Sequence, residues 1–247
     1  MGTGKLHSWS EYLLTKIDRM TINFEPVPWN SKDVLLASLI VVSFVLGYFL
    51  LSWLLVYTFG LAEPADYPTV TIFLSEGIMI FAVWLFAARR YNTKWTKLGL
   101  RPADRFGTYL APFLVLFTIM IFTAGYSYVA SSYGPEFIKP PAIPEGLLGS
   151  GLHRFVMIFA LVIWGPFAEE IFFRGFMMTA LVPTFGVFGA TIVSSLIFAA
   201  SHMSVGSLVP IFVSGVLFSL LYLRTRSIWP PMTAHALQNF VVVAEMT

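Results

Sequence analysis

The chain of 247 residues contains no cysteine. Disulfide bonds and thiol catalysis are therefore excluded, and the redox compartment cannot be inferred from cysteine usage. Charged residues are also scarce, at 11% of the chain, where soluble proteins average about 25%. The net charge of +2 is too small to indicate a nucleic-acid partner. No stretch of the chain is polar enough and long enough to form a soluble domain.

Apolar residues dominate instead, at 57% of the chain. Runs of about 20 apolar residues cross the hydrocarbon core of a bilayer as helices. The sequence therefore predicts an all-α, polytopic transmembrane bundle of about seven helices, formed by a single transmembrane domain over residues 34–247. The predicted spans are 34–58, 69–88, 108–129, 155–181, 187–202, 206 to just before 224, and a short seventh helix that opens at Pro230-Pro231.

Residues 1–33 form a separate N-terminal segment. Apolar side chains recur at helical spacing over residues 5–20, which predicts an amphipathic helix. Such a helix either anchors in the bilayer interface or packs on the flank of the protein. A turn-rich connector follows at 25–30, and no signal-peptide core is expected because long apolar runs begin only at residue 34.

Basic residues mark the predicted topology. Residues 89–105 contain six Arg and Lys, so this loop is expected to be cytoplasmic. Arg224 and Arg226 fit the same side. Seven crossings then leave the N-terminus in the cytoplasm and the C-terminus outside, in an integral, multi-pass membrane protein with membrane lipid around it.

The fourth span contains the motif Glu169-Glu170-Ile-Phe-Phe-Arg174. Ionised groups inside a membrane are costly and are usually functional. Glu170 and Arg174 are four residues apart and share a helix face, which predicts a neutralising ion pair. Glu169 lies about 100° away around the helix and lacks that partner, so it is the better candidate for a general base. A purely structural charge cluster is the alternative.

Two further helices carry polar side chains that suit the same site. His202 ends the segment Phe198-Ala-Ala-Ser-His202, and His235 lies one turn before Asn239. A histidine and an amide on one face can donate two hydrogen bonds to a developing oxyanion. Gln238 is expected to point elsewhere.

Glu76 interrupts the second span. It could pair with the active site, face a neighbouring helix or lie near the interface.

Together, Glu169, His202, His235 and Asn239 suit the hydrolysis of an amide within the bilayer. A cofactor is not required. Zinc is the alternative, with Glu169, His202 and His235 as its ligands. The sequence has no His-Glu-x-x-His motif, which argues weakly against the common zinc form.

These residues resemble the motifs of the CPBP family of CAAX proteases and bacteriocin-processing enzymes (Abi), which includes the Ras-converting CAAX prenyl endopeptidase. The three motifs are Glu-Glu-x-x-x-Arg at 169–174, Phe-x-x-x-His at 198–202 and His-x-x-x-Asn at 235–239. They occur in order on successive apolar segments, over roughly residues 155–243. The segment Leu98-Gly99-Leu100-Arg101 also resembles the family's lead-in to the preceding span.

The resemblance implies a glutamate-type intramembrane endopeptidase with catalytic helices in 155–247. It implies that Glu169 activates water with His202, and that His235 and Asn239 stabilise the oxyanion. Glu170, Arg174 and Phe198 would support the site. The expected substrate is a peptide or protein, lipid-modified or membrane-anchored. Many family members are described as metalloproteases, which keeps zinc open.

Two other functions compete with this hypothesis. A non-catalytic immunity or scaffold protein of the same fold would use the motifs structurally. A proton-coupled transporter would use the buried carboxylates, but the inverted repeats expected of many transporters are not evident.

Overall fold

The structure, a computed structural model, describes residues 26–60, 68–103, 110–142, 144 and 146–246. These residues form helices and connections without a strand, which confirms the predicted all-α bundle. The amphipathic helix predicted at 5–20 lies outside the described residues. The elements are α2 (Ser31–Phe59), α3 (Pro68–Val83), η2 (Trp84–Arg89), η3 (Trp95–Leu98), α4 (Ala111–Tyr133), η5 (Glu136–Ile138), α5 (Gly151–Phe159), η6 (Ala160–Trp164), α6 (Gly165–Glu169), η7 (Glu170–Met178), α7 (Thr179–Ser201), α8 (Val205–Thr225) and α9 (Trp229–Ala244).

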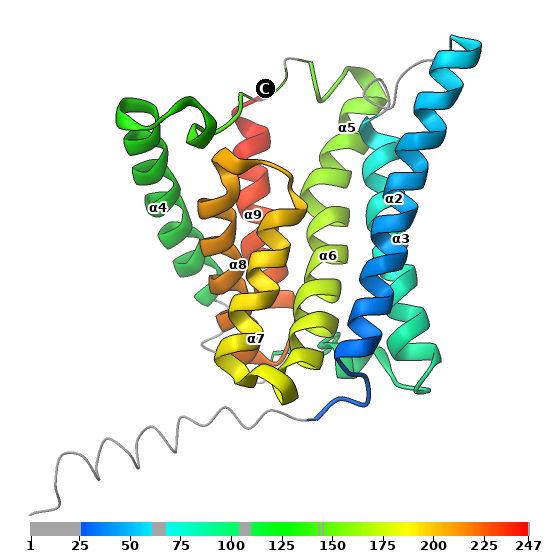
Figure 1. The fold of residues 1–247 in the computed structure, drawn as a ribbon. Coiled ribbons are helices and arrows are strands. Elements are labelled where there is room, and N and C mark those ends of the chain that lie inside the picture. The colour runs from blue at the N-terminus through cyan, green and yellow to red at the C-terminus, as the bar shows by residue number, and fades with distance from the viewer. Residues whose placement is uncertain (1–25, 61–67, 104–109, 143, 145, 247) are drawn as a thin grey trace, which may run out of the picture.

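Five helical stretches of the described chain are long and apolar enough to cross a membrane. One of them, Gly151–Ser201, has a non-helical residue at Gly186, with φ 67° and ψ 173°. The chain reverses there, so this stretch makes two passes (Figure 1). With α9, which is shorter at 16 residues, the described passes agree with the predicted seven.

Some predicted boundaries differ from those of the structure by a few residues. The fourth span, expected to end at 181, continues through Pro183, and the break before the fifth span is at Gly186, in agreement with the predicted start at 187. Gly186 reverses the chain because its positive φ costs little without a Cβ. The sixth helix does not end before Arg224 but continues to Thr225, and Arg226 caps it in the left-handed conformation.

The helices form one bundle with roughly aligned axes (Figure 1). Helices α2 and α3 pack together at one edge, and α4 lies at the opposite edge against α8 and α9. The long helix made of α5, η6, α6 and η7 runs between these two edges. It contacts α3 on one side and α7, α8 and α9 on the other. The motif helix is therefore central.

The motif helix is not a regular α-helix. Residues Ala160–Trp164 (η6) and Glu170–Met178 (η7) are π-helical, and the short α6 between them ends at Glu169. Pro166 near the start of α6 has no N–H to donate to the preceding turn, and that turn widens. Widened turns of this kind often occur at functional sites. Here they flank the Glu169–Glu170 pair.

The start of α2 is tied to the end of η2 by one buried carboxylate. Asp33 Oδ2 accepts hydrogen bonds from the Asn30 N–H at 3.0 Å and the Tyr91 hydroxyl at 2.7 Å. Arg90 lies 3.3 Å from Asp33 Oδ1. The hydrogen bond to Asp33 raises the pKa of Tyr91, because ionising the phenol would break it.

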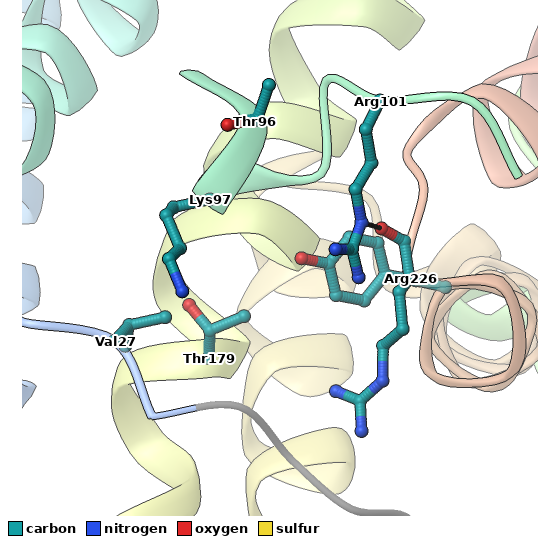
Figure 2. Close-up of a pocket in the computed structure, with 7 residues that line it drawn as sticks. Val27, Thr96, Lys97, Arg101, Thr179 and Arg226 are labelled. Carbon is teal, nitrogen blue, oxygen red and sulfur yellow. Dashed lines mark hydrogen bonds between the residues drawn. The ribbon is translucent and has the colours of Figure 1, made fainter. Parts of the chain in front are cut away.

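The predicted lead-in, Leu98–Arg101, docks beneath the motif helix. Leu98 is fully buried, and its carbonyl approaches Gly175 of η7. Arg101 Nε donates to the Arg226 carbonyl at 2.8 Å, and Ile228 N–H donates to the Gly99 carbonyl at 2.9 Å. Figure 2 shows the Arg101–Arg226 bond beside a small cavity at this basic end of the bundle. None of the motif residues at 169–174, 198–202 or 235–239 lines this cavity.

We expect Gly175→Ala to destabilise the bundle by about 1–3 kcal/mol. A Cβ at this position would overlap the backbone oxygen of Leu98, which cannot move aside as a flexible side chain could. The measurement is the unfolding midpoint in mixed detergent micelles. Gly125→Ala in α4 is the matched control, because its Cβ meets nothing within 4 Å. Equal midpoints for the two variants would contradict the close packing of this segment.

Candidate active site

The predicted ion pair between Glu170 and Arg174 is present at the centre of the bundle. Arg174 Nη1 donates to Glu170 Oε1 at 2.7 Å, and both side chains are 0% exposed. Arg174 Nη2 also donates to the Gly215 carbonyl of α8, at 3.3 Å. A buried charge is tolerated only when it is paired and hydrogen-bonded. Arg174 therefore pairs with Glu170 within η7 and also links η7 to α8.

Two phenylalanines cover the guanidinium of Arg174. Its Cζ lies 4.3 Å from the ring centroid of Phe198 and 5.3 Å from that of Phe218. Aromatic faces attract a cation, and they do so more strongly where water is excluded. The structure thus gives Phe198, predicted as a supporting residue, a contact with the buried charge. The sequence does not predict the role of Phe218, because nothing in its spacing distinguishes it from other apolar residues of α8.

His235 joins the buried pair to the second carboxylate. Its Nδ1 lies 3.1 Å from Glu170 Oε1, and its Nε2 lies 3.4 Å from Glu169 Oε2. Its ring stacks on Phe218 at a centroid distance of 4.9 Å. Since a carboxylate oxygen paired with Arg174 accepts, Nδ1 is the nitrogen placed to donate to Glu170. The Nε2 contact with Glu169 becomes an ion pair when the ring is doubly protonated.

His202 lies at the end of α7, where its Nδ1 is 2.9 Å from the Phe198 carbonyl oxygen. A carbonyl oxygen only accepts, so Nδ1 carries the proton and Nε2 of the neutral ring is an acceptor. The ring packs edge-on against Phe198 at a centroid distance of 5.0 Å. Phe198 therefore orients His202 through both its ring and its backbone.

Asn239 projects from α9 one turn after His235. Its Nδ2 donates to the Leu161 carbonyl in η6 at 2.9 Å. The widened π-turn is the part of the motif helix that receives this hydrogen bond. One N–H and the carbonyl oxygen of the amide remain for other partners. Asn239 is thereby held beside the Glu169–His235 contact.

All four predicted catalytic side chains line one cavity of about 320 Å³. Helix α6 provides Glu169, the end of α7 provides His202, and α9 provides His235 and Asn239. Glu169 is 16% exposed at the side chain, in contrast to the fully buried Glu170. The remaining lining is largely apolar, apart from Glu76 of α3. An apolar cavity with a few converging polar groups is the usual form of a ligand site.

A second cavity of about 280 Å³ adjoins the first at the two histidines. His202, His235 and Asn239 line both cavities, but Glu169 lines only the first. The second cavity has a more polar wall that includes Gln238, Thr123 and several serines. Gln238 does not line the first cavity with Glu169 and lies instead at the wall of the second. Its Oε1 is buried without a protein partner.

The described residues do not form a metal site. Among them, no group of three or more His, Cys, Asp or Glu side chains is arranged to hold a metal ion. The set proposed for zinc, Glu169, His202 and His235, is engaged differently. His235 uses both ring nitrogens on carboxylates, and His202 uses Nδ1 on a backbone carbonyl. The zinc alternative does not fit this geometry.

Comparison with known proteins agrees with the motifs and their arrangement. Residues 151–241 match the family described as type II CAAX prenyl endopeptidase Rce1-like. This segment of the chain is therefore similar to that CAAX protease family. The match begins at the first residue of α5 and ends within α9. It therefore includes all four side chains predicted to be catalytic.

Two relatives are similar over part of their length. The chain is 38% identical over 92 residues to YdiL of Bacillus subtilis (strain 168), named as a candidate membrane peptidase; the match covers 37% of this chain and 38% of YdiL. It is 33% identical over 150 residues to the membrane-embedded CAAX protease MroQ of Staphylococcus aureus (strain USA300), covering 56% of this chain and 59% of MroQ. The chain thus spans less than two thirds of either relative. No solved structure matches it significantly.

We expect Arg174→Met to cost about 3–5 kcal/mol of stability, because it leaves Glu170 charged and buried. The double variant Glu170→Gln/Arg174→Met should cost less than the single one, since it removes both charges. Unfolding midpoints of the parental, two single and double variants complete the cycle. If Arg174→Met were as stable as the parental protein, the ion pair would not support the bundle.

Proposed function

We propose that the chain is an intramembrane endopeptidase, in which Glu169 activates a water molecule for attack on a peptide bond. The observation that carries the proposal is the contact of Glu169 with His235 at the wall of the 320 Å³ cavity. Glu170 is fully buried, its Oε1 is held by Arg174 and His235, and it does not line the cavity, so it is the poorer candidate for a base. Among the described contacts Glu169 meets only His235, and its partial exposure at the cavity wall leaves it available to water.

A proton shared by Glu169 and His235 would suit this role. When it lies on His235, Glu169 is a carboxylate that can accept a proton from water, and His235 Nε2–H is a donor. Amide hydrolysis needs a base at the attacking water and donors at the developing oxyanion. One protonation state of the pair supplies both. Glu170, through Nδ1, holds the ring in this orientation.

His202 and Asn239 complete the proposed site. The Phe198 carbonyl holds Nδ1 of His202, which leaves Nε2 of the neutral ring as an acceptor. Nε2 can therefore position the attacking water beside Glu169. The second N–H of Asn239 can join His235 at the oxyanion, because its first N–H is fixed on Leu161. Each group is oriented by a second hydrogen bond, as effective catalytic groups require.

The second cavity suits the supply of water. Thr123 Oγ1 and Gln238 Oε1 are buried without protein partners, and both residues line this cavity. Ser207 and Ser214 line the same cavity. Buried water binds where several polar groups converge in enough space. Water held there would meet His202 and His235, which also line the cavity of Glu169. The apolar first cavity would then receive the substrate.

We further propose that the N-terminus is cytoplasmic and that the substrate cavity opens toward the other side. The basic segments around Lys94 and Arg226 lie at the end of the bundle where α2 begins (Figure 1). Leu147 and Met246, at the opposite end, line the cavity. The positive-inside rule assigns the basic end to the cytoplasm. A membrane-anchored peptide entering from the outer half of the bilayer is the substrate class that this arrangement favours.

Glu169→Gln is expected to abolish cleavage while the protein still inserts and folds, since glutamine cannot accept the proton from water. His202→Ala should lower the rate by about 10²–10⁴-fold. Native membranes with parental or Glu169→Gln protein are compared by mass spectrometry of new peptide termini, with and without a chelator. Glu136→Gln, at an exposed loop, is the control and should cleave normally.

This comparison also separates the competing functions. A scaffold or immunity protein would keep its function with Glu169→Gln but not with Arg174→Met. Termini that appear equally with parental and Glu169→Gln protein would exclude a glutamate mechanism. Loss of cleavage by chelation alone would contradict the proposal that no metal takes part.

The absence of cysteine allows a direct test of the topology. In intact cells, an impermeant maleimide should label Glu136→Cys, in the loop opposite the basic end. Lys94→Cys, which is also exposed, should be labelled only after the membrane is permeabilised. The reverse pattern would place the cavity mouth in the cytoplasm.

A further inference from the structure

Glu76 is a third carboxylate in the wall of the proposed substrate cavity. It belongs to α3, which packs against α6, η6 and η7 of the motif helix. Its side chain lines the same cavity as Glu169, His202 and His235. Because α3 precedes residues 151–241, Glu76 is not part of the matched family domain. The function proposed above does not use it.

Glu76 has no cation to neutralise it within the described part of the chain. Its Oε2 is buried and lacks a hydrogen-bond partner. Arg174 is held by Glu170, and His235 lies between Glu169 and Glu170. An isolated carboxylate is costly in an apolar setting, and two carboxylates facing one cavity resist being ionised together. These constraints favour the protonated acid at Glu76.

A protonated acid in this position has a chemical use. A peptide bond in the cavity would have a base, Glu169, at one wall and an acid, Glu76, at another. The leaving amine of a peptide is a poor leaving group unless it is protonated as the C–N bond breaks. His235 and Asn239 are already assigned to the oxyanion. The remaining titratable side chains of the cavity wall are His202 and Glu76. The Nδ1 of His202 is held by the Phe198 carbonyl and its Nε2 is an acceptor when the ring is neutral, so Glu76 is the available acid.

We propose that Glu76 is the general acid, which gives its proton to the leaving amine. This inference rests on the proposed function. The water oxygen bonds to the carbonyl carbon as one water proton passes to Glu169. The C–N bond then breaks, and the nitrogen takes the proton from Glu76. The products are a carboxylic acid and an amine, and transfer of the proton from Glu169 to Glu76 restores the site.

The first test needs no substrate. Infrared spectra of the purified protein in detergent, in H₂O and D₂O, detect the C=O stretch of a protonated buried carboxyl group. The Glu169→Gln single variant should show this band, which then cannot come from Glu169. The Glu76→Gln/Glu169→Gln double variant should lack the band. Ser75→Ala is the control on the same helix, since its hydroxyl donates only to the Ile72 carbonyl. An unchanged band after Glu76→Gln would overturn the proposal.

The second test compares two leaving groups. The probe is an internally quenched farnesyl-cysteine CaaX peptide, together with the analogue that has an ester at the scissile bond. An alkoxide leaves with less need of a proton than an amine does. We expect Glu76→Gln to slow amide cleavage by at least about 100-fold and ester cleavage by less than about 3-fold. Ser75→Ala should leave both rates unchanged.

Other outcomes are equally decisive. If Glu76→Gln slows both probes equally, Glu76 has a structural role and the inference is wrong, although the endopeptidase function stands. If the parental protein cleaves neither probe, a CaaX substrate is excluded and the infrared test alone decides the state of Glu76. Should Glu76→Gln fail to fold, Glu76→Asp is tested instead, because it keeps an acid at a shorter reach. We then expect amide cleavage to slow more than ester cleavage. Equal losses on the two probes would overturn the proposal.

Discussion

The buried ion pair between Glu170 and Arg174 is the interaction on which the rest of the site depends. It places a full negative charge in the centre of a membrane bundle and neutralises that charge within one helix turn. The same carboxylate oxygen also fixes His235, and the same guanidinium reaches the backbone of α8. Helices η7, α8 and α9 are thereby held by one set of charge-assisted hydrogen bonds, which are the strong ones in a water-poor interior.

Two adjacent glutamates consequently have different environments. Glu170 is fully buried, with Oε1 held by Arg174 and His235, which suits the positioning role proposed for it. Glu169 faces a cavity and shares its contact with His235 alone. The difference arises from the helix, since consecutive residues point in different directions around its axis. The membrane increases the difference between the two environments, because a carboxylate that faced lipid would have no partner for its charge.

The sequence was sufficient to predict the spans and the Glu170–Arg174 pair, because apolar run length and four-residue spacing are local properties. It did not predict the widened turns η6 and η7, nor that Leu98 would dock against Gly175. Those features depend on contacts between distant segments. The depth at which each candidate side chain lies also depends on packing between helices, which the length of an apolar run does not determine.

The sequence by itself therefore determined an all-helical membrane protein, the residue types of the site and the pairing within one helix. Only the tertiary structure decided which histidine meets Glu169. His235 rather than His202 makes that contact, and His202 is held by Phe198. It also decided that Glu76 of α3 joins the cavity of α6, α7 and α9. The physical reason is that helical periodicity fixes neighbours within a helix, whereas packing between helices fixes which faces, and at what depth, come together.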